Sequence, residues 1–254
     1  MSAATALRIG LFGRGRLAGA IAASAADAIA WQVAREDAPS TRVDVAIEAS
    51  SGAAVERRLA WALSTGTPLV IGSTGWELPD LAARVGDRIG VVVAPNFSLS
   101  VALMRRLTTV LGRFAALDPA RDPYLVEHHH ARKKDAPSGT AKLLARTLIE
   151  ACPRKTGWVV GGPVAPEQLS IAVIRAGTTY STHTLGLDCP AEVLELTHAS
   201  RSAAAYADGA LEAARWIRSR KGVHAFDAVA ADVLDPLFAG LRSDPPSRSR
   251  SDVR

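Results

Sequence analysis

The segment 127–141 gathers the side chains of this sequence that could do chemistry. It reads Glu-His-His-His-Ala-Arg-Lys-Lys-Asp-Ala-Pro-Ser-Gly-Thr-Ala and holds three of the six histidines. Imidazole titrates near neutral pH, and lysine and arginine attract anions. Ser138 is an expected helix N-cap, and the helix start at Gly139 and Thr140 offers unpaired backbone N–H groups to an anion. This combination indicates a site that binds a small carboxylate and transfers a proton.

Two other interpretations of this segment are a metal-binding tract and a solvated basic loop. Adjacent residues of a strand point to opposite faces, so His128, His129 and His130 cannot all converge on one ion. The sequence nearby also lacks the second cysteine or carboxylate cluster that a closed zinc site needs. A solvated loop explains Arg132 and Lys134 but not the ordered helix start that follows them. We therefore predict no metal site and favour proton transfer.

A glycine-rich turn near the N-terminus forms a second candidate site. The pattern Gly-x-Gly-x-x-Ala at Gly13, Gly15 and Ala18 follows an apolar strand and precedes an alanine-rich helix. The first glycine allows a tight turn, the second lets a pyrophosphate approach the backbone, and the small third residue lets helix pack on strand. A purely structural turn is the alternative, but the strand–turn–helix context favours a dinucleotide site. The residues expected to contact the cofactor here are Gly10, Gly13, Arg14, Gly15 and Arg16.

The residues that would read the ribose of the dinucleotide are expected about twenty positions later, at the end of the second strand. Arg35, Glu36 and Asp37 occur there. An acid would bind the 2′-hydroxyl of NAD, and an arginine would pair with the 2′-phosphate of NADP. The sequence offers both, so it predicts a nicotinamide cofactor and leaves NADH and NADPH open.

Strands and helices alternate around the glycine turn as far as residue 98. Expected strands cover 7–12, 31–34, 43–48, 68–72 and 90–95, and expected helices cover 17–26, 53–63 and 78–85. The strands are continuously apolar, which is typical of a parallel sheet with helices on both faces. The sequence therefore predicts an α/β fold whose first domain, residues 1–98, is a Rossmann-like dinucleotide-binding domain.

The pattern changes from residue 99. Strands are expected at 123–127, 169–175, 183–187 and 191–198, and helices at 101–111, 141–151 and 203–217. The polar alternation around Glu192 and Glu195 indicates antiparallel strands with one wet face. We predict a second, mixed α/β domain with an open sheet at 99–210, for substrate binding and oligomerisation. The chain is expected to return to the first domain at about 211–241, and the polar tail 242–254 is expected to be disordered.

Composition narrows the classes of function. The chain has 254 residues, 48% of them hydrophobic, and a net charge of +5. The tail from Arg242 onward has four arginines and two aspartates, so the rest of the chain carries only +3. A charge this small does not indicate a nucleic-acid-binding protein. Cys152 and Cys189 do not suggest a disulfide framework. With no signal segment and no apolar stretch of membrane-spanning length, a cytoplasmic protein is expected.

With both sites in view, the sequence resembles the 4-hydroxy-tetrahydrodipicolinate reductase (dihydrodipicolinate reductase) family of the diaminopimelate route to lysine. Segment 127–141 resembles that family's signature, Glu-x-His-His-x-x-Lys-x-Asp-x-Pro-Ser-Gly-Thr-Ala. Further blocks agree in order along nearly the whole chain except the tail: the Gly-Ser-Thr-Gly loop 72–75, Ala-Pro-Asn-Phe-Ser 94–98, Arg175-Ala-Gly with His183, and the late helix 209–216.

The resemblance implies roles for individual residues. His129 would be the general acid, and Lys133 would assist protonation or hold a substrate carboxylate. His130, Gly139 and Thr140 would bind the dicarboxylate. The nicotinamide side of the cofactor would be lined by Gly72, Thr74, Ala94 and Phe97. The resemblance also implies NAD(P)H-dependent reduction and a homotetramer assembled through the sheet of the second domain.

Several positions depart from the family pattern. Ser100 and Ser181 replace glycines, and Glu48-Ala49 replaces an Asp-Phe pair at the end of the third strand. Several of the departures touch the cofactor side, and the proton donor and Lys133 are retained. Two alternatives therefore stay open: a diverged NAD(P)-dependent oxidoreductase acting on another small imino or keto acid, and a non-catalytic dinucleotide sensor.

Overall fold

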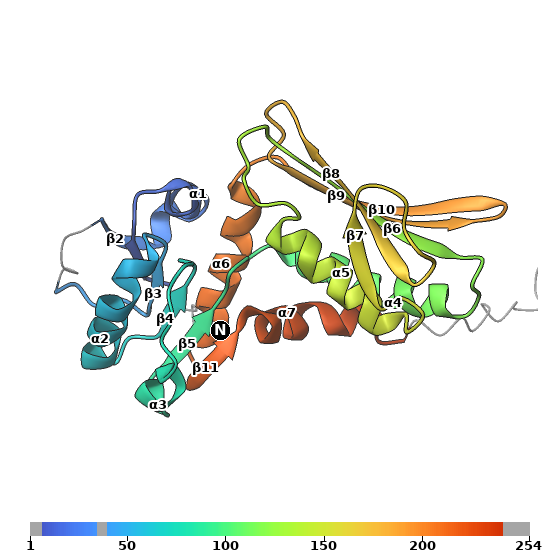
Figure 1. Ribbon diagram of the computed structural model, residues 1–254. Coiled ribbons are helices and arrows are strands. Elements are labelled where there is room, and N and C mark those ends of the chain that lie inside the picture. The colour runs from blue at the N-terminus through green and yellow to red at the C-terminus, as the bar shows by residue number, and fades with distance from the viewer. Residues whose placement is uncertain (1–6, 35–39, 241–254) are drawn as a thin grey trace, which may run out of the picture.

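The chain folds into two lobes, each built around one β-sheet (Figure 1). The computed structural model describes residues 7–34 and 40–240. Six parallel strands form the first sheet in the order β11-β5-β4-β3-β1-β2, and five strands form the second in the order β10-β9-β6-β8-β7. The predicted α/β class, a Rossmann-like parallel sheet followed by a mixed sheet, is confirmed.

The strands of the first sheet are mainly apolar, and its four inner strands are buried on both faces, whereas the two edge strands are mostly half-buried. The strands of this sheet are β1 (Ile9–Phe12), β2 (Ile29–Val33), β3 (Val45–Glu48), β4 (Leu69–Ile71), β5 (Gly90–Val93) and β11 (Gly222–Ala225). On one face, Ile47, Val70 and Val92 pack in a core with α1 (Arg16–Ser24) and α6 (Ala204–Ile217). The other face packs against α2 (Val55–Thr65) and α3 (Leu81–Val85). This two-sided burial is what continuous apolar strands require.

The second sheet is covered by helices on one face only. Its strands are β6 (Asp122–His129), β7 (Gly157–Val160), β8 (Gln168–Arg175), β9 (Ser181–Cys189) and β10 (Glu192–Ser200). Strand β6 alternates between buried and half-buried residues, and its buried Leu125 packs with residues of α4 (Leu99–Ala116) and α5 (Gly139–Ala151). Strand β6 is parallel to β8 and antiparallel to β9, so the sheet is mixed.

Two strands and one helix of the structure were not expected from the sequence. Strands β7 and β11 lie at the edges of their sheets, lack the two-sided burial of the inner strands, and become strands by pairing with β8 and β5. The apolar run 226–233 is helix α7 (Phe226–Leu234). A short apolar run does not by itself distinguish helix from strand, so tertiary packing decides.

The return of the chain toward the first lobe is visible in Figure 1, where α6 stands between the lobes and β11 lies beside β5. Helix α6 packs against α1, and 3-10 turns at Ala26–Ala28, Gly52–Ala54 and Asp235–Phe238 complete the described elements. The domain limits given above stay predictions, and tail 242–254 lies outside the described residues. Among the helices that the structure describes, none combines the length and apolar character that a bilayer crossing requires.

Candidate active site

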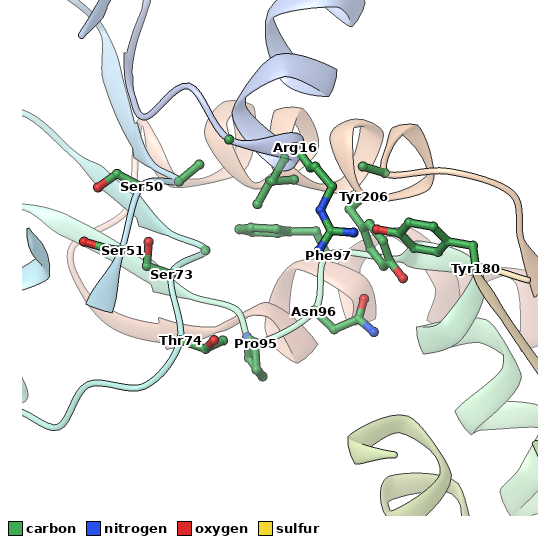
Figure 2. Close-up of a pocket in the computed structure, with 15 residues that line it drawn as sticks. Arg16, Ser50, Ser51, Ser73, Thr74, Pro95, Asn96, Phe97, Tyr180 and Tyr206 are labelled. Atoms are coloured by element: carbon green, nitrogen blue, oxygen red, sulfur yellow. The ribbon is translucent and has the colours of Figure 1, made fainter. Parts of the chain in front are cut away.

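A cavity of about 490 Å³ lies where the strands of the first sheet end. The carboxyl edge of a parallel sheet is where such folds bind ligands. Segments that follow β1, β3, β4 and β5 all contribute to its wall. Figure 2 shows serines of the first lobe on one side and two tyrosines on the other. The lining residues are Gly15, Arg16, Leu17, Ala49, Ser50, Ser51, Gly72, Ser73, Thr74, Pro95, Asn96, Phe97, Tyr180, Ala203 and Tyr206.

The glycine turn fits a phosphate group. Gly13 has a φ of +118°, and a Cβ there would lie 2.5 Å from the carbonyl oxygen of Ala49, so only glycine fits this turn. Gly15 is the N-cap of α1, and in the described part of the chain no side chain caps that helix and no acidic residue lies in its first turn. The first N–H groups of α1 are therefore available to an anion, beside the guanidinium of Arg16.

The side of this cavity that was expected to hold the nicotinamide is shaped by the loops after β4 and β5. A Cβ at Gly72 would lie 2.5 Å from the ring of Phe97, so the missing side chain lets this ring lie against the loop. Glu48, fully buried, accepts hydrogen bonds from Ser50 N at 2.7 Å and Ser73 Oγ at 3.0 Å. The carboxylate at the end of β3 thus ties the two serine loops together.

Four of the residues expected at the cofactor are placed differently or are not described. Gly10 lies inside β1, where a Cβ would lie 2.2 Å from the Trp31 ring, so its glycine serves packing. Ala94 is buried and lines neither cavity. The predicted ribose-reading residues Arg35 and Glu36 lie outside the described residues. Gly13 and Arg14 adjoin the first cavity without lining it, whereas Gly15, Arg16, Gly72, Thr74 and Phe97 line it.

A second cavity, of about 520 Å³, contains all five residues expected at the substrate: His129, His130, Lys133, Gly139 and Thr140. It lies between the start of α5 and the ends of β6 and β9. The two cavities are contiguous, because both are lined by Arg16, Pro95, Asn96, Tyr180 and Tyr206. In Figure 2 the Arg16 side chain extends toward the tyrosine rings at this junction. A bound dinucleotide in the first cavity would therefore face a ligand in the second.

One ring nitrogen of His129 is hydrogen-bonded, and the other faces a carboxylate without a hydrogen bond. Its Nδ1 lies 3.1 Å from the carbonyl oxygen of Tyr180, and its Nε2 lies 3.5 Å from Oε2 of Glu127. Burial lowers the pKa of His129, and His183 and Lys133 lower it further, while the Glu127 carboxylate opposes them. His128 points to the other face of β6, where its Nε2 lies 3.0 Å from the Ala176 carbonyl oxygen. Strand alternation thus separates the two neighbouring histidines, as expected.

The start of α5 is tied to the same strand. Ser138 caps the helix, its Oγ accepting from the N–H of Ala141 at 3.1 Å. The N–H of Ser138 donates to both carboxylate oxygens of Glu127 at 3.1 Å, and its Oγ lies 3.1 Å from Nε2 of His183. Lys133 pairs with Asp135 at 2.7 Å, which lowers the pKa of that carboxyl. The donor groups for an anion are therefore anchored before any ligand binds.

Glu127, His129 and His183 also have the side-chain types of a metal site, with candidate ligand atoms within 4.8 Å of one another. The sequence argument excluded three consecutive histidines, not this set. Both oxygens of Glu127 already accept hydrogen bonds, one of them from Arg175 at 2.6 Å. We therefore interpret the group as a hydrogen-bonded cluster, and the absence of a metal stays a prediction.

The sequence interpretation missed several lining residues. Ser138 was expected as the cap of the helix start, and His183 only as part of a block that resembles the family. Tyr180, Tyr206 and Arg146 also line the second cavity and had no local signal. Glu127 and His183 are directly opposite in the pairing of β6 with β9, which the strand register alone reveals.

Comparisons with known proteins agree with this geometry. Residues 9–97 match the family description "Dihydrodipicolinate reductase, N-terminus", and residues 99–230 match "Dihydrodipicolinate reductase, C-terminus". The chain is 35% identical over 195 residues to the 4-hydroxy-tetrahydrodipicolinate reductase of Laribacter hongkongensis, over 73% of this chain and 72% of that protein. It is 38% identical over 185 residues to the protein of the same name from Thermomicrobium roseum, over 70% of each.

A solved structure supports the fold independently. A dipicolinate-bound dihydrodipicolinate reductase from Paenisporosarcina sp. TG-14 superposes with a TM-score of 0.68 at 19% identity, over 86% of this chain and 97% of that one. At this identity the likeness concerns the fold alone. The two matching halves span residues 9–230 with one residue between them. The chain therefore belongs to the dihydrodipicolinate reductase family, whose members are NAD(P)H-dependent oxidoreductases of lysine biosynthesis.

Proposed function

We propose that this chain reduces a dihydrodipicolinate-type cyclic dicarboxylate to its tetrahydro form, with His129 and Lys133 handling the proton. The observation that carries the proposal is the junction of the two cavities, which brings the glycine turn and the histidine segment to one place. Bound NADH or NADPH would supply a hydride, that is, one proton together with two electrons. One proton then completes the reduction of the substrate double bond, and the oxidised nicotinamide is released.

The second cavity offers a dicarboxylate several positive groups. Arg16 and Lys133 line it, and the start of α5 contributes the N–H groups of Gly139 and Thr140. Helix N-termini and charge-assisted hydrogen bonds bind carboxylates well. His130 lines the same wall. These groups would fix the two carboxylates of the substrate so that the ring between them faces the first cavity.

His129 is the group suited to give the proton. It lies within the second cavity, and general acid catalysis needs a donor whose pKa is near the working pH. Lys133 is less than ten residues from the start of α5 and is half-buried beside Asp135. Its ammonium would stabilise the negative charge of the substrate and assist protonation of the substrate.

The test is steady-state turnover of two variants with matched neighbours. His129→Gln and Lys133→Ala should each lower kcat by about 10²- to 10⁴-fold, the usual contribution of a positioned acid–base group. His128→Gln, which faces the opposite side of β6, and Lys134→Ala, which is exposed, should keep kcat within about twofold. Near-normal turnover in both site variants, measured with freshly generated synthase product, would refute the proposed roles.

The preferred nicotinamide is measured in the same assay. Initial rates with NADH and NADPH would be compared for the wild type and for Arg35→Ala. If Arg35 reads the 2′-phosphate, the variant loses rate with NADPH and keeps its rate with NADH. Equal loss with both cofactors would contradict that role.

We also propose a homotetramer assembled through the open face of the second sheet, as is usual in this family. Ile174 and Val193 are 44% and 58% exposed there. Their pairing partners are His128 and Asp188, which lie on the face away from α4 and α5. Light scattering should give four chains for the wild type and fewer for Ile174→Asp. A wild-type monomer would exclude this assembly.

A further inference from the structure

We propose that Glu127 is the positioning residue of the site: one buried carboxylate orients the imidazole of His129 and anchors the helix start that binds the substrate carboxylate. The inference rests on the proposed role of His129 as proton donor. Glu127 itself does not touch the substrate cavity, because it is fully buried and is not part of the cavity wall.

The first step is that Glu127 is charged and fully paired inside the lobe. Its Oε1 accepts from Nη2 of Arg175 at 2.6 Å, and both oxygens accept from the N–H of Ser138. An unpaired buried carboxylate would be very costly, so these partners are a condition of its burial. Burial raises the pKa of Glu127, but hydrogen bonds from His183, Ser138 and Arg175 outweigh it and lower this pKa far below its ordinary value.

The surroundings of His129 act on the protonation of its ring. One ring nitrogen faces the Tyr180 carbonyl oxygen at 3.1 Å and the other faces Oε2 of Glu127 at 3.5 Å. A neutral imidazole has a single N–H and would leave one nitrogen lone pair against an acceptor, whereas an imidazolium has two N–H groups. The carboxylate of Glu127 therefore favours the protonated ring, against burial, His183 and Lys133, which lower the pKa of His129.

The third step is the coupling between proton donor and carboxylate cradle. Ser138 donates its N–H to Glu127 and caps α5 with its hydroxyl, which also contacts His183. The next two residues, Gly139 and Thr140, line the substrate cavity. One carboxylate thus fixes His129 and the first turn of α5 relative to each other. Positioning of this kind is worth large factors in rate when reacting groups must meet within a few tenths of an ångström.

The charge around His129 gives the direction of the effect. His183 of β9 and Lys133 of the loop after β6 face it and favour the neutral ring, and Glu127 is the neighbouring anion. Arg175 of β8 reaches His129 only through Glu127, and Asp135 is taken up by Lys133. The remaining charged groups of the cavity are the cations Arg16 of α1 and Arg146 of α5. Removing the anion leaves the Tyr180 carbonyl oxygen as the one named neighbour that still favours the protonated ring, against burial, His183 and Lys133.

The experiment compares Glu127→Gln, which keeps the shape and removes the charge, with Glu150→Gln on the exposed side of α5 as control. The pH profile of kcat should keep its form in Glu127→Gln, but its high-pH limb should move to lower pH. At pH 8 the loss in kcat should be at least about tenfold, as for a weakened general acid, with a much smaller change in KM. Glu127→Asp, which restores the charge, should recover part of the loss and also serves if Glu127→Gln does not fold.

Two further measurements separate positioning from a merely structural role. In a His129→Gln background, Glu127→Gln should lose the pH-dependent part of its effect, because that part acts through His129, whereas an effect through the start of α5 would remain at every pH. NMR titration of labelled imidazole should show a lower pKa for His129 in Glu127→Gln than in the wild type. An unchanged pH profile with an unchanged His129 titration would overturn the inference, and so would an equal loss in both backgrounds at every pH.

Failure of the proposed function would look different. If His129→Gln keeps wild-type turnover, His129 is not the proton donor, whatever Glu127 does. The NMR titration does not depend on turnover and would still report whether Glu127 controls the charge of His129. An inactive His129→Gln together with an unshifted titration in Glu127→Gln would reject the inference alone.

Discussion

Removal of Arg175 tests how the second lobe tolerates the buried charge of Glu127. Arg175 extends from the end of β8, and its Nη2 lies 2.6 Å from both Oε1 of Glu127 and the carbonyl oxygen of Asp135. The arginine side chain is 16% exposed and the glutamate is fully buried. Arg175→Ala would therefore leave a carboxylate in the protein interior without its counter-charge, and the chain would unfold more easily.

The size of the effect follows from this geometry. Breaking a buried ion pair by removing one partner costs roughly 3–5 kcal/mol. Glu127 would keep the N–H of Ser138 and the nearby imidazole of His183, so we expect the lower end, about 3 kcal/mol. Hydrogen bonds from His183, Ser138 and Arg175 overcome the effect of burial and lower the folded pKa of Glu127 below its ordinary value of 4.5. Stability from this pairing is thus full above that value and is lost as the pH falls.

The assay is urea denaturation followed by tryptophan fluorescence, at pH 7 and at pH 4, with the chain concentration held constant. The difference between wild type and Arg175→Ala should be largest at pH 7 and shrink toward acid. Arg84→Ala removes an exposed pair with Glu56 and should cost less than about 1 kcal/mol. Adding Glu127→Gln to Arg175→Ala should recover much of the loss. A loss below about 1 kcal/mol at pH 7, or no recovery in the double variant, would refute this reasoning.

Three further predictions concern packing, a buried lysine and metal. A Cβ at Gly209 of α6 would lie 1.8 Å from the Phe97 carbonyl oxygen, so Gly209→Ala should lower the free energy of unfolding by about 1–3 kcal/mol and weaken nucleotide binding. Gly19→Ala on α1, where a Cβ would meet open space, should instead raise Tm. Equal Tm values for the two variants would contradict this reasoning. The Nζ of the buried Lys155 lies 2.6 Å from Asp122. Lys155→Met should lower the free energy of unfolding by about 1–3 kcal/mol in urea denaturation, and an unchanged midpoint would contradict this. Dialysis against EDTA should leave turnover unchanged, and a loss of turnover that only added zinc restores would contradict this prediction.

Local sequence patterns predicted the first lobe well because its elements follow one another within short stretches of the chain. An apolar strand, a glycine turn and a helix follow one another within residues 9–24. Gly13 has a positive φ, a backbone conformation that favours glycine, so the residue type itself indicates the turn. Strands β7 and β11 had no comparable signal, because they are half-buried edge strands that form by pairing with β8 and β5.

The substrate side was predictable for a similar reason. His129, Lys133 and Thr140 lie within twelve residues of one another, and alternation along β6 already separates His129 from His128. The tyrosines at the junction of the cavities were not predictable. Tyr180 precedes β9 and Tyr206 lies in α6, so only the packing of α6 between the lobes brings them together.

The sequence by itself determined which groups are available: a glycine turn for phosphate, an imidazole and a lysine for proton transfer, and a serine-capped helix for a carboxylate. Tertiary structure decided how those groups are charged and aimed. The pairing of β6 with β9 sets Glu127 opposite His183, and the pairing with β8 brings Arg175 to the same carboxylate. Register and burial depend on contacts between distant segments, and they alone turn neighbouring residue types into a coupled site.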